Sequence, residues 1–432
     1  MTKIDLLIIG AGGQIGSYFM LKLYSTEARL GALDLPQPVK ALTTQELRIE
    51  KDVYYPDDKT VIPLGKIIAN PKTLAPGEVA AYSTMALGQI GLADGAVIFV
   101  AVKAYDYAAV QDLIKEIAKP DSVITYLVNG LAPEEKALAG HKARGITNTL
   151  VRVVIMGGTD YELQEIGSHP VRLVRSGISE IVIGNWFEKK TPEFEQTLQR
   201  VKTLFPPQRL QVRAEFENSF RKDSFDKTLA NLINPVSALI GCTCGEVIDN
   251  QLLRGLMTRI IEQGISVGRN LGLNLGNSEE IIQSRLKMYE DAGQQHLSSM
   301  GRDALLSALR GAMFRHENEN IGIALVEKST GVDTSLLRKV NSLLEQECAI
   351  YNQLQQKDIA LARDFLLSYW RLNRLCCGLS PNMDYIISQY PTLPGYLERI
   401  KQDYTPKPLP SDPPAFLALL EENIHQIKPL HI

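Results

Sequence analysis

A lysine and two asparagines lie close together in the otherwise apolar run 225–240. On a continuous helix, Asn231 and Asn234 lie about 40° and about 20° to either side of Lys227, so that the three side chains form one polar stripe. Burying such a stripe without partners costs a few kcal/mol per group, so a polar ligand is expected to face it. Pro235 removes a helix hydrogen bond and is expected to kink this helix. Two interpretations are open: a substrate site with a lysine proton donor, or a partly exposed helix face with ordinary caps.

A second group of residues suited to ligand binding lies near the N-terminus. The apolar run Ile4–Ile9 is followed by Gly10, Gly13 and Gly16, spaced G-x-x-G-x-x-G, and then by a helical pattern over residues 18–24. A strand, a glycine-rich turn and a helix start are the parts of a dinucleotide-binding unit, because glycine lets the backbone approach a pyrophosphate and the helix supplies N–H groups. The residues expected to hold the cofactor are Gly10, Ala11, Gly12, Gly13, Gln14 and Ile15.

Asp34 ends the next predicted strand, 18 residues after Gly16. A carboxylate at this place accepts hydrogen bonds from ribose hydroxyls and repels a 2′-phosphate, which favours NAD over NADP. The alternative is a helix-capping or loop aspartate before Pro36.

Two further polar residues follow buried strands. Lys103 comes after the apolar run 96–102, and Asn129 after the run 122–128. Strands that alternate with helices form a parallel sheet, whose ligands lie beyond the carboxyl ends of the strands. Lys103 is therefore a candidate for a ribose or phosphate contact, and Asn129 for the nicotinamide ribose or the substrate. Surface charge and a plain turn are the respective alternatives.

The remaining pattern predicts an α/β protein: an N-terminal Rossmann-type doubly wound sheet followed by an all-α domain. We expect strands near residues 47–50 and 60–63, a helix over 73–87, antiparallel additions to the sheet at 150–155, 171–174 and 180–183, and a surface helix over 192–204. Helical periodicity dominates after Arg213, which predicts three parts: a dinucleotide-binding domain (1–215), a helical substrate domain (216–345) and a helical C-terminal extension (346–432).

The extension is predicted to hold an amphipathic segment (347–375), a proline-rich connection (404–414) and a closing helix (416–426). We expect it to serve in packing or oligomerisation, with a lid over a larger substrate as the alternative.

Composition excludes several classes of function. The chain has 432 residues, 45% hydrophobic and 22% charged, with a net charge of −3, as in ordinary globular proteins, and it has no basic excess for nucleic acid. Four apolar residues before Gly10 are too few for a signal peptide or a membrane span. The five cysteines have neither disulfide-framework nor metal-site spacing, so we expect reduced thiols, no metal and a cytoplasmic location. They are Cys242, Cys244, Cys348, Cys376 and Cys377.

Several of these stretches, taken in order, resemble the ketopantoate reductase (2-dehydropantoate 2-reductase) family over roughly residues 4–345. The resemblance rests on Gly10–Gly12, Val102–Tyr105, Asn129–Leu131, Glu180–Gly184, the Lys227…Asn231…Asn234-Pro235 stretch and His296–Asp303, which is similar to the family's serine-methionine-aspartate helix.

The resemblance implies a reductase of pantothenate biosynthesis that reduces a 2-oxo acid with a nicotinamide cofactor, at a cleft between a Rossmann domain and a helical domain. It makes Lys227 the proton donor to the oxygen on which charge builds during hydride addition. NADPH is the family norm, whereas Asp34 argues for NADH. A homodimer is the commonest assembly of soluble enzymes. The implied substrate-binding residues are Asn129, Asn231, Asn234, Ser299 and either Glu317 or Glu319.

Three departures from the family pattern keep other functions open. The two helix asparagines are three residues apart rather than four, the cofactor turn has one extra residue, and Glu317 lies 14 residues after Asp303. The alternatives are an opine-type reductive aminase and a non-catalytic nicotinamide-binding regulatory protein.

Overall fold

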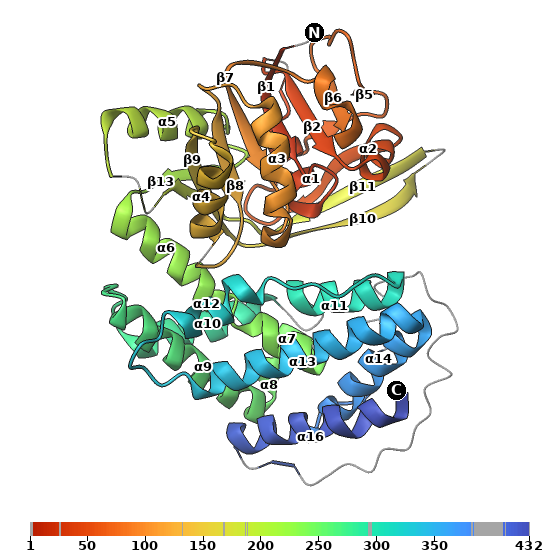
Figure 1. Cartoon of the computed structure of the whole chain (residues 1–432), viewed down its shortest axis with the longest axis vertical. Coiled ribbons are helices and arrows are strands. Elements are labelled where there is room, and N and C mark those ends of the chain that lie inside the picture. The colour runs from red at the N-terminus through yellow and green to blue at the C-terminus, as the bar shows by residue number, and fades with distance from the viewer. Residues whose placement is uncertain are drawn as a thin grey trace. The chain divides into compact units, whose positions relative to one another are not determined.

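The computed structural model describes residues 3–431 apart from 26, 132, 167–168, 186, 188, 293–295, 382, 384–408 and 411 (Figure 1). Residues 404–408 and 411 of the predicted proline-rich connection lie outside the described residues. The chain divides into two compact units, which we call unit 1 (Met1–Lys227) and unit 2 (Thr228–Ile432). The predicted divisions at residues 215 and 345 stay predictions.

Unit 1 is built on a nine-stranded sheet of order β13-β12-β9-β8-β7-β1-β2-β6-β5. The strands from β9 to β5 in this order are parallel to their neighbours, whereas β12 is antiparallel to β9 and parallel to β13. The strands are β1 (Lys3–Ile9), β2 (Leu30–Asp34), β5 (Ile67–Ala69), β6 (Val79–Ser83), β7 (Gly91–Val100), β8 (Val123–Leu127), β9 (Thr149–Met156), β12 (Glu180–Gly184) and β13 (Gln211–Ala214).

Continuous apolar runs make these strands because helices cover both faces of the sheet. In β1, Leu6 and Ile8 belong to the core on one face, and Leu7 and Ile9 to the core on the other. The first core includes α1 (Gln14–Leu23), α2 (Pro36–Thr43) and α5 (Pro192–Thr203), and the second includes α3 (Tyr107–Ile117) and α4 (Pro133–Arg144). The predicted doubly wound α/β unit is confirmed.

A second, four-stranded sheet has the order β10-β11-β3-β4. Its strands are β10 (Thr159–Ile166), β11 (His169–Ser176), β3 (Glu46–Asp52) and β4 (Val61–Ile62), and β11 pairs parallel with β3. A buried ion cluster ties this sheet to α1: the Lys22 ammonium lies 2.8 Å from the Asp52 carboxylate and 2.7 Å from that of Asp58.

Two expectations for unit 1 were wrong. Residues 73–87 are not a helix, because β6 and the 3-10 helix η1 (Thr84–Gln89) occupy most of this stretch. The predicted antiparallel additions hold for β12, but β9 is parallel to β8, and β11 belongs to the second sheet.

The helix α6 (Glu217–Ala230) crosses the division between the units, and every longer element described after it is helical. The predicted all-α second part is confirmed. No helix among the described residues is long and apolar enough to span a membrane. The elements are α7 (Ile233–Ile240), α8 (Cys244–Asp249), α9 (Gln251–Asn270), α10 (Ser278–Ala292), α11 (Ser299–Arg310), η3 (Asn318–Asn320), α12 (Gly322–Glu327), α13 (Ser335–Lys357), α14 (Ile359–Cys376) and α16 (Pro413–His431).

The C-terminal helices pack within unit 2. The predicted amphipathic segment is parts of two helices, α13 and α14, which pack against each other and against α16. The fully buried Arg374 of α14 donates hydrogen bonds to the Gly241 carbonyl at 2.8 Å and to Glu246 at 2.9 Å. This guanidinium therefore joins the extension to the chain around α7 and α8.

Candidate functional site

The glycine turn between β1 and α1 has no room for side chains at three of its positions: Gly10, Gly12, where a Cβ would lie 2.7 Å from the Pro38 Cβ, and Gly16. Gly10 has a φ of +82°, and a Cβ there would lie 2.8 Å from the Ala101 carbonyl oxygen of the chain after β7. A Cβ at Gly16 would overlap the Gly10 carbonyl oxygen. Gly16 is therefore the glycine that lets the helix approach the strand, in agreement with the spacing read from Gly10, Gly13 and Gly16.

Asp34 is joined to this turn. Its Oδ2 accepts the Gly12 N–H at 2.8 Å, and its Oδ1 accepts the Leu35 N–H at 2.8 Å. Burial raises the pKa of Asp34 above its usual value, and the two N–H donors and Arg172 oppose this effect. Asp34 does not cap α2, whose N-cap is Leu35. The carboxylate thus lies beside the backbone that is expected to hold the pyrophosphate.

Arg172, from β11, supports the turn and was not predicted as a site residue. Its Nη1 donates to the Gly12 carbonyl at 2.7 Å and to the Ser17 hydroxyl at 2.7 Å, and its guanidinium stacks 4.3 Å from the centroid of the Tyr161 ring. The signal in the sequence is an arginine inside the apolar stretch Val171–Val174, because a buried charge needs partners.

The predicted cofactor residues follow four neighbouring strands. Because β2, β1, β7 and β8 are parallel, their carboxyl ends lie along one edge of the sheet. Asp34 ends β2, the glycine turn follows β1, and half-buried Lys103 and Asn129 follow β7 and β8. The structure therefore brings all the predicted cofactor residues to the same edge of unit 1.

Lys227 also belongs to unit 1. It is half-buried on α6, and its ammonium donates a hydrogen bond to the Gly157 carbonyl at 3.0 Å. Gly157 directly follows β9 and has a φ of +131°.

The expected continuous helix through residues 227–234 is wrong. The helix α6 ends at Ala230 and α7 begins at Ile233, and between them the backbone makes the shorter bonds of a turn, from the Asn231 N–H to Thr228 and from the Asn234 N–H to Asn231. Pro235 falls in the first turn of α7, where its missing N–H leaves no carbonyl unbonded. The angles of a straight helix do not apply across this break.

In unit 2, Asn231 lies in the turn before α7, and Asn234 lies against the start of α11. Both are largely buried, and the Asn234 Nδ2 lies 3.2 Å from the Ser299 hydroxyl, to which it donates. Ser299 is exposed and is the first residue of α11. The buried Nδ2 of Asn231 has no hydrogen-bond partner within the described part of the chain. An amide donor of this kind is available for an oxygen of a ligand.

The two candidate glutamates follow α11 in the chain. Glu317 is half-buried and precedes η3, and exposed Glu319 is part of it. This short helix packs against α12. The substrate-binding role of either glutamate stays a prediction.

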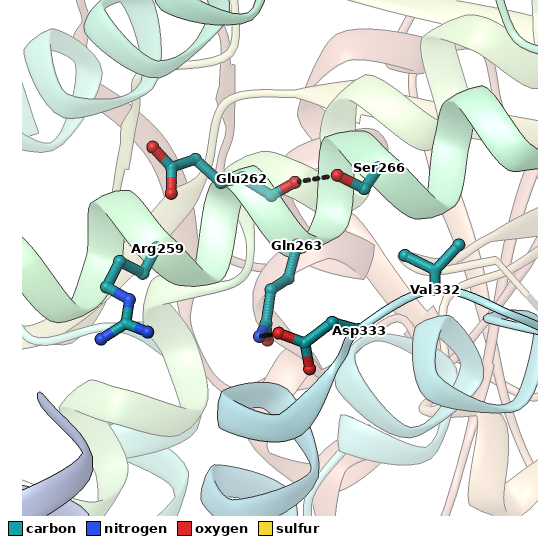
Figure 2. A pocket seen from close by; sticks show the side chains of 6 residues that line it. All are labelled: Arg259, Glu262, Gln263, Ser266, Val332 and Asp333. Carbon is teal, nitrogen blue, oxygen red and sulfur yellow. Dashed lines mark hydrogen bonds between the residues drawn. The ribbon is translucent and has the colours of Figure 1, made fainter.

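A polar pocket of about 210 Å³ opens on α9, and none of the predicted site residues lines it (Figure 2). Gln263 donates to Asp333 across it at 3.3 Å. No group of three or more metal-ligating side chains occurs in the residues that the structure describes. The pocket is lined by Arg259, Glu262, Gln263, Ser266, Val332 and Asp333.

Comparison with known proteins finds two profiles of one family along the chain. The family profile described as Ketopantoate reductase PanE/ApbA matches residues 6–187, and the profile described as Ketopantoate reductase PanE/ApbA C terminal matches residues 219–311. No curated protein matches the chain.

Solved structures share the fold at low sequence identity. The PanE/ApbA family ketopantoate reductase from Ralstonia eutropha JMP134 is 16% identical with a TM-score of 0.58, over 81% of this chain and 99% of that one. D-Mandelate dehydrogenase with NADH and anilino(oxo)acetate is 14% identical with a TM-score of 0.58, over 80% and 98%. A dimeric ketopantoate reductase from Staphylococcus aureus is 18% identical with a TM-score of 0.53, over 80% and 98%.

The two profiles together cover well over half of the sequence, on both sides of the division between the units. The chain belongs to the ketopantoate reductase family.

Proposed function

We propose that this protein reduces a 2-oxo acid to the 2-hydroxy acid with NAD(P)H, and that ketopantoate is the first substrate to test. The observation that carries the proposal is the alignment of the glycine turn, Asp34, Lys103 and Asn129 along one edge of the sheet in unit 1, the unit that also holds Lys227. Family membership supports the same reaction class.

The residues of the turn fit a nicotinamide dinucleotide. The helix α1 begins after Gly13 without a side-chain cap, which leaves backbone N–H groups for a pyrophosphate. Asp34 is placed to accept the hydroxyls of a ribose, which favours NADH. The bound cofactor supplies the hydride. Lys103 and Asn129 are the proposed contacts to the remaining ribose and phosphate groups.

Lys227 is the proposed proton donor. Addition of a hydride to a ketone builds negative charge on the oxygen, and a positioned ammonium neutralises that charge by giving up a proton. The Gly157 carbonyl accepts one of the three N–H groups of Lys227 and so limits the directions in which the others point.

The amides of unit 2 are the proposed substrate ligands. The Nδ2 of Asn231, which has no hydrogen-bond partner among the described residues, is suited to a carboxylate or carbonyl oxygen. Asn234 and Ser299 form a hydrogen-bonded pair that offers both donors and acceptors. Glu317 or Glu319 is assigned to a substrate hydroxyl by the family resemblance alone.

The test is loss of nicotinamide absorbance on addition of ketopantoate, with benzoylformate as an aromatic 2-oxo acid for comparison. Lys227→Ala should lower kcat by roughly 10²–10⁴-fold with the fold retained. Lys222→Ala, an exposed lysine of the same helix, is the matched control and should keep wild-type turnover. Equal turnover in Lys227→Ala would refute the lysine's role.

Two other outcomes would reassign the function. Turnover that requires an added amino acid would identify an opine-type reductive aminase. Tight NADH binding without reduction of any 2-oxo acid would identify a regulatory protein.

We also expect a homodimer, as described for the Staphylococcus aureus relative. Light scattering coupled to size exclusion would measure the mass, and a monomer at micromolar concentration would contradict this expectation.

A further inference from the structure

Arg152 is a fully buried cation in the middle of β9, within an apolar run. The N–H groups of its guanidinium donate to several different acceptors. Nη1 donates to the Glu134 carboxylate and to the Ser224 hydroxyl, each at 2.7 Å, and Nη2 donates to the Gly130 carbonyl at 2.6 Å. One side chain therefore satisfies groups from three different segments of unit 1.

Two of these segments carry residues of the proposed reaction. Gly130 directly follows Asn129, and Ser224 precedes Lys227 by three residues on α6, which is close to one helical turn. The Ser224 hydroxyl also lies 3.4 Å from the Gly130 carbonyl. The loop after β8 and the helix that carries Lys227 thus meet at one guanidinium.

A second contact links the same strand to the same helix. Lys227 donates to the Gly157 carbonyl, one residue after the end of β9. Because residues three apart on a helix share a face, Ser224 and Lys227 both point toward this strand. The strand β9 therefore holds α6 at two points, one of which is the ammonium itself.

Arginine is required for this arrangement. Its planar fork offers five N–H donors in fixed directions, whereas lysine offers three from a single atom and cannot span the same acceptors. Glu134 balances the charge, and its second oxygen has no partner among the described residues. Burial raises the pKa of Glu134 to about 7, and the charge and hydrogen bond of Arg152 oppose this effect.

We propose that Arg152 is a positioning residue that fixes Lys227 and the Asn129 loop on the sheet through Ser224 and Gly130. This role rests on the proposed function of Lys227. The guanidinium itself touches neither substrate nor cofactor in this assignment, because it is fully buried.

The test compares Ser224→Ala and Arg152→Lys with Asp58→Asn. Asp58→Asn weakens a different buried ion cluster of unit 1, the one that joins Asp58 to Lys22 of α1, and serves as the matched control. Each full-length variant is measured for kcat and KM with the 2-oxo acid, for the Kd of NADH, and for the rate at which acetic anhydride acetylates Lys227, followed by mass spectrometry.

We expect Ser224→Ala and Arg152→Lys to lower kcat by about tenfold or more, because a displacement of about 1 Å is enough for that loss. The Kd of NADH should rise by a smaller factor than kcat falls, because the glycine turn is untouched and Asn129 is the one proposed cofactor contact in the affected loop, and the acetylation rate of Lys227 should change several-fold. Asp58→Asn should lower the melting temperature but leave both kcat and the acetylation rate of Lys227 at their wild-type values. If Arg152 had a purely structural role, all three variants would lose stability, and Ser224→Ala and Arg152→Lys would not differ from Asp58→Asn in kcat or in the acetylation of Lys227.

Wild-type kcat and wild-type acetylation of Lys227 in Ser224→Ala would overturn the proposal, and this variant removes only a hydroxyl, so it remains informative if Arg152→Lys does not fold. If the wild-type protein reduces no 2-oxo acid but the acetylation rate changes in Ser224→Ala, the proposed function fails while the positioning role stands.

Discussion

Replacing Asp34 tests which cofactor the turn accepts and separates the charge of this carboxylate from its hydrogen bond to the backbone. The carboxylate already accepts the Gly12 N–H at 2.8 Å, and each oxygen has a further lone pair for a ribose hydroxyl. Asp34→Asn keeps an oxygen for Gly12 but removes the charge. Asp34→Ser removes the charge and the reach to Gly12.

The expected changes in cofactor affinity follow from the negative charge of the Asp34 carboxylate. A hydrogen bond to a charged acceptor contributes about 1.5–3 kcal/mol, so the loss of two ribose bonds in Asp34→Ser should weaken NADH binding by at least about 100-fold. A 2′-phosphate about 5 Å from a carboxylate, at an effective dielectric constant of about 20, is repelled by roughly 3 kcal/mol per unit of phosphate charge. Wild-type protein should therefore bind NADH at least about 100-fold more tightly than NADPH, and Asp34→Asn should recover most of the NADPH affinity.

The assay is fluorescence titration of both cofactors into the wild type and both variants at two salt concentrations. The NADPH gain in Asp34→Asn should shrink at high salt, because screening weakens a repulsion between partly exposed charges. Tighter binding of NADPH than of NADH by the wild type would refute the reasoning, as would an unchanged ratio of the two affinities in Asp34→Asn.

Three further predictions concern unit 1. Lys22→Met leaves two buried carboxylates without their cation and should lower the free energy of unfolding in urea by about 3–5 kcal/mol; a loss under about 1 kcal/mol would contradict this. Burial lowers the pKa of His141 to about 4. Between pH 6.5 and pH 4 the unfolded chain therefore binds the proton first, and the stability of the wild type relative to His141→Gln should fall by up to about 3 kcal/mol as the pH drops from 7 to 4; a pH-independent difference would refute the assignment. Gly16→Ala places a methyl group on the Gly10 carbonyl and should lower stability by about 1–3 kcal/mol, whereas Gly13→Ala, with 3.3 Å to the same oxygen, should lower the melting temperature by less in thermal unfolding; equal losses in the two variants would contradict this.

The parallel sheet could be predicted because its signals are local. Apolar runs such as Ile4–Ile9, followed by glycine or a polar residue and then by a helical pattern, mark strands buried on both faces. The same logic placed Asp34, Lys103 and Asn129 at the carboxyl ends of neighbouring strands. Local pattern failed at Val79–Ser83, because a run containing two alanines fits a helix as well as a buried strand.

Other features depend on contacts that no local pattern encodes. The pairing of β11 with β3 joins Val171 to Glu46, so nothing near either strand indicates a second sheet. Pro235 was recognised as a helix disruptor, but whether the helix bends or restarts is decided by packing in the surroundings. Arg152 and Arg172 each interrupt an apolar strand. Their partners could not be named from sequence, although a need for partners could be.

The support of the glycine turn by Arg172 has a consequence for how the protein is made. The guanidinium reaches back 160 residues along the chain to the Gly12 carbonyl, and β11 pairs with β3 over a shorter separation, Val171 with Glu46. A ribosome releases the first βα unit long before this arginine emerges, so the loop is completed only after most of unit 1 has been synthesised. A nascent chain that ends before His169 contains every cofactor-binding residue proposed here but lacks the strand that braces them.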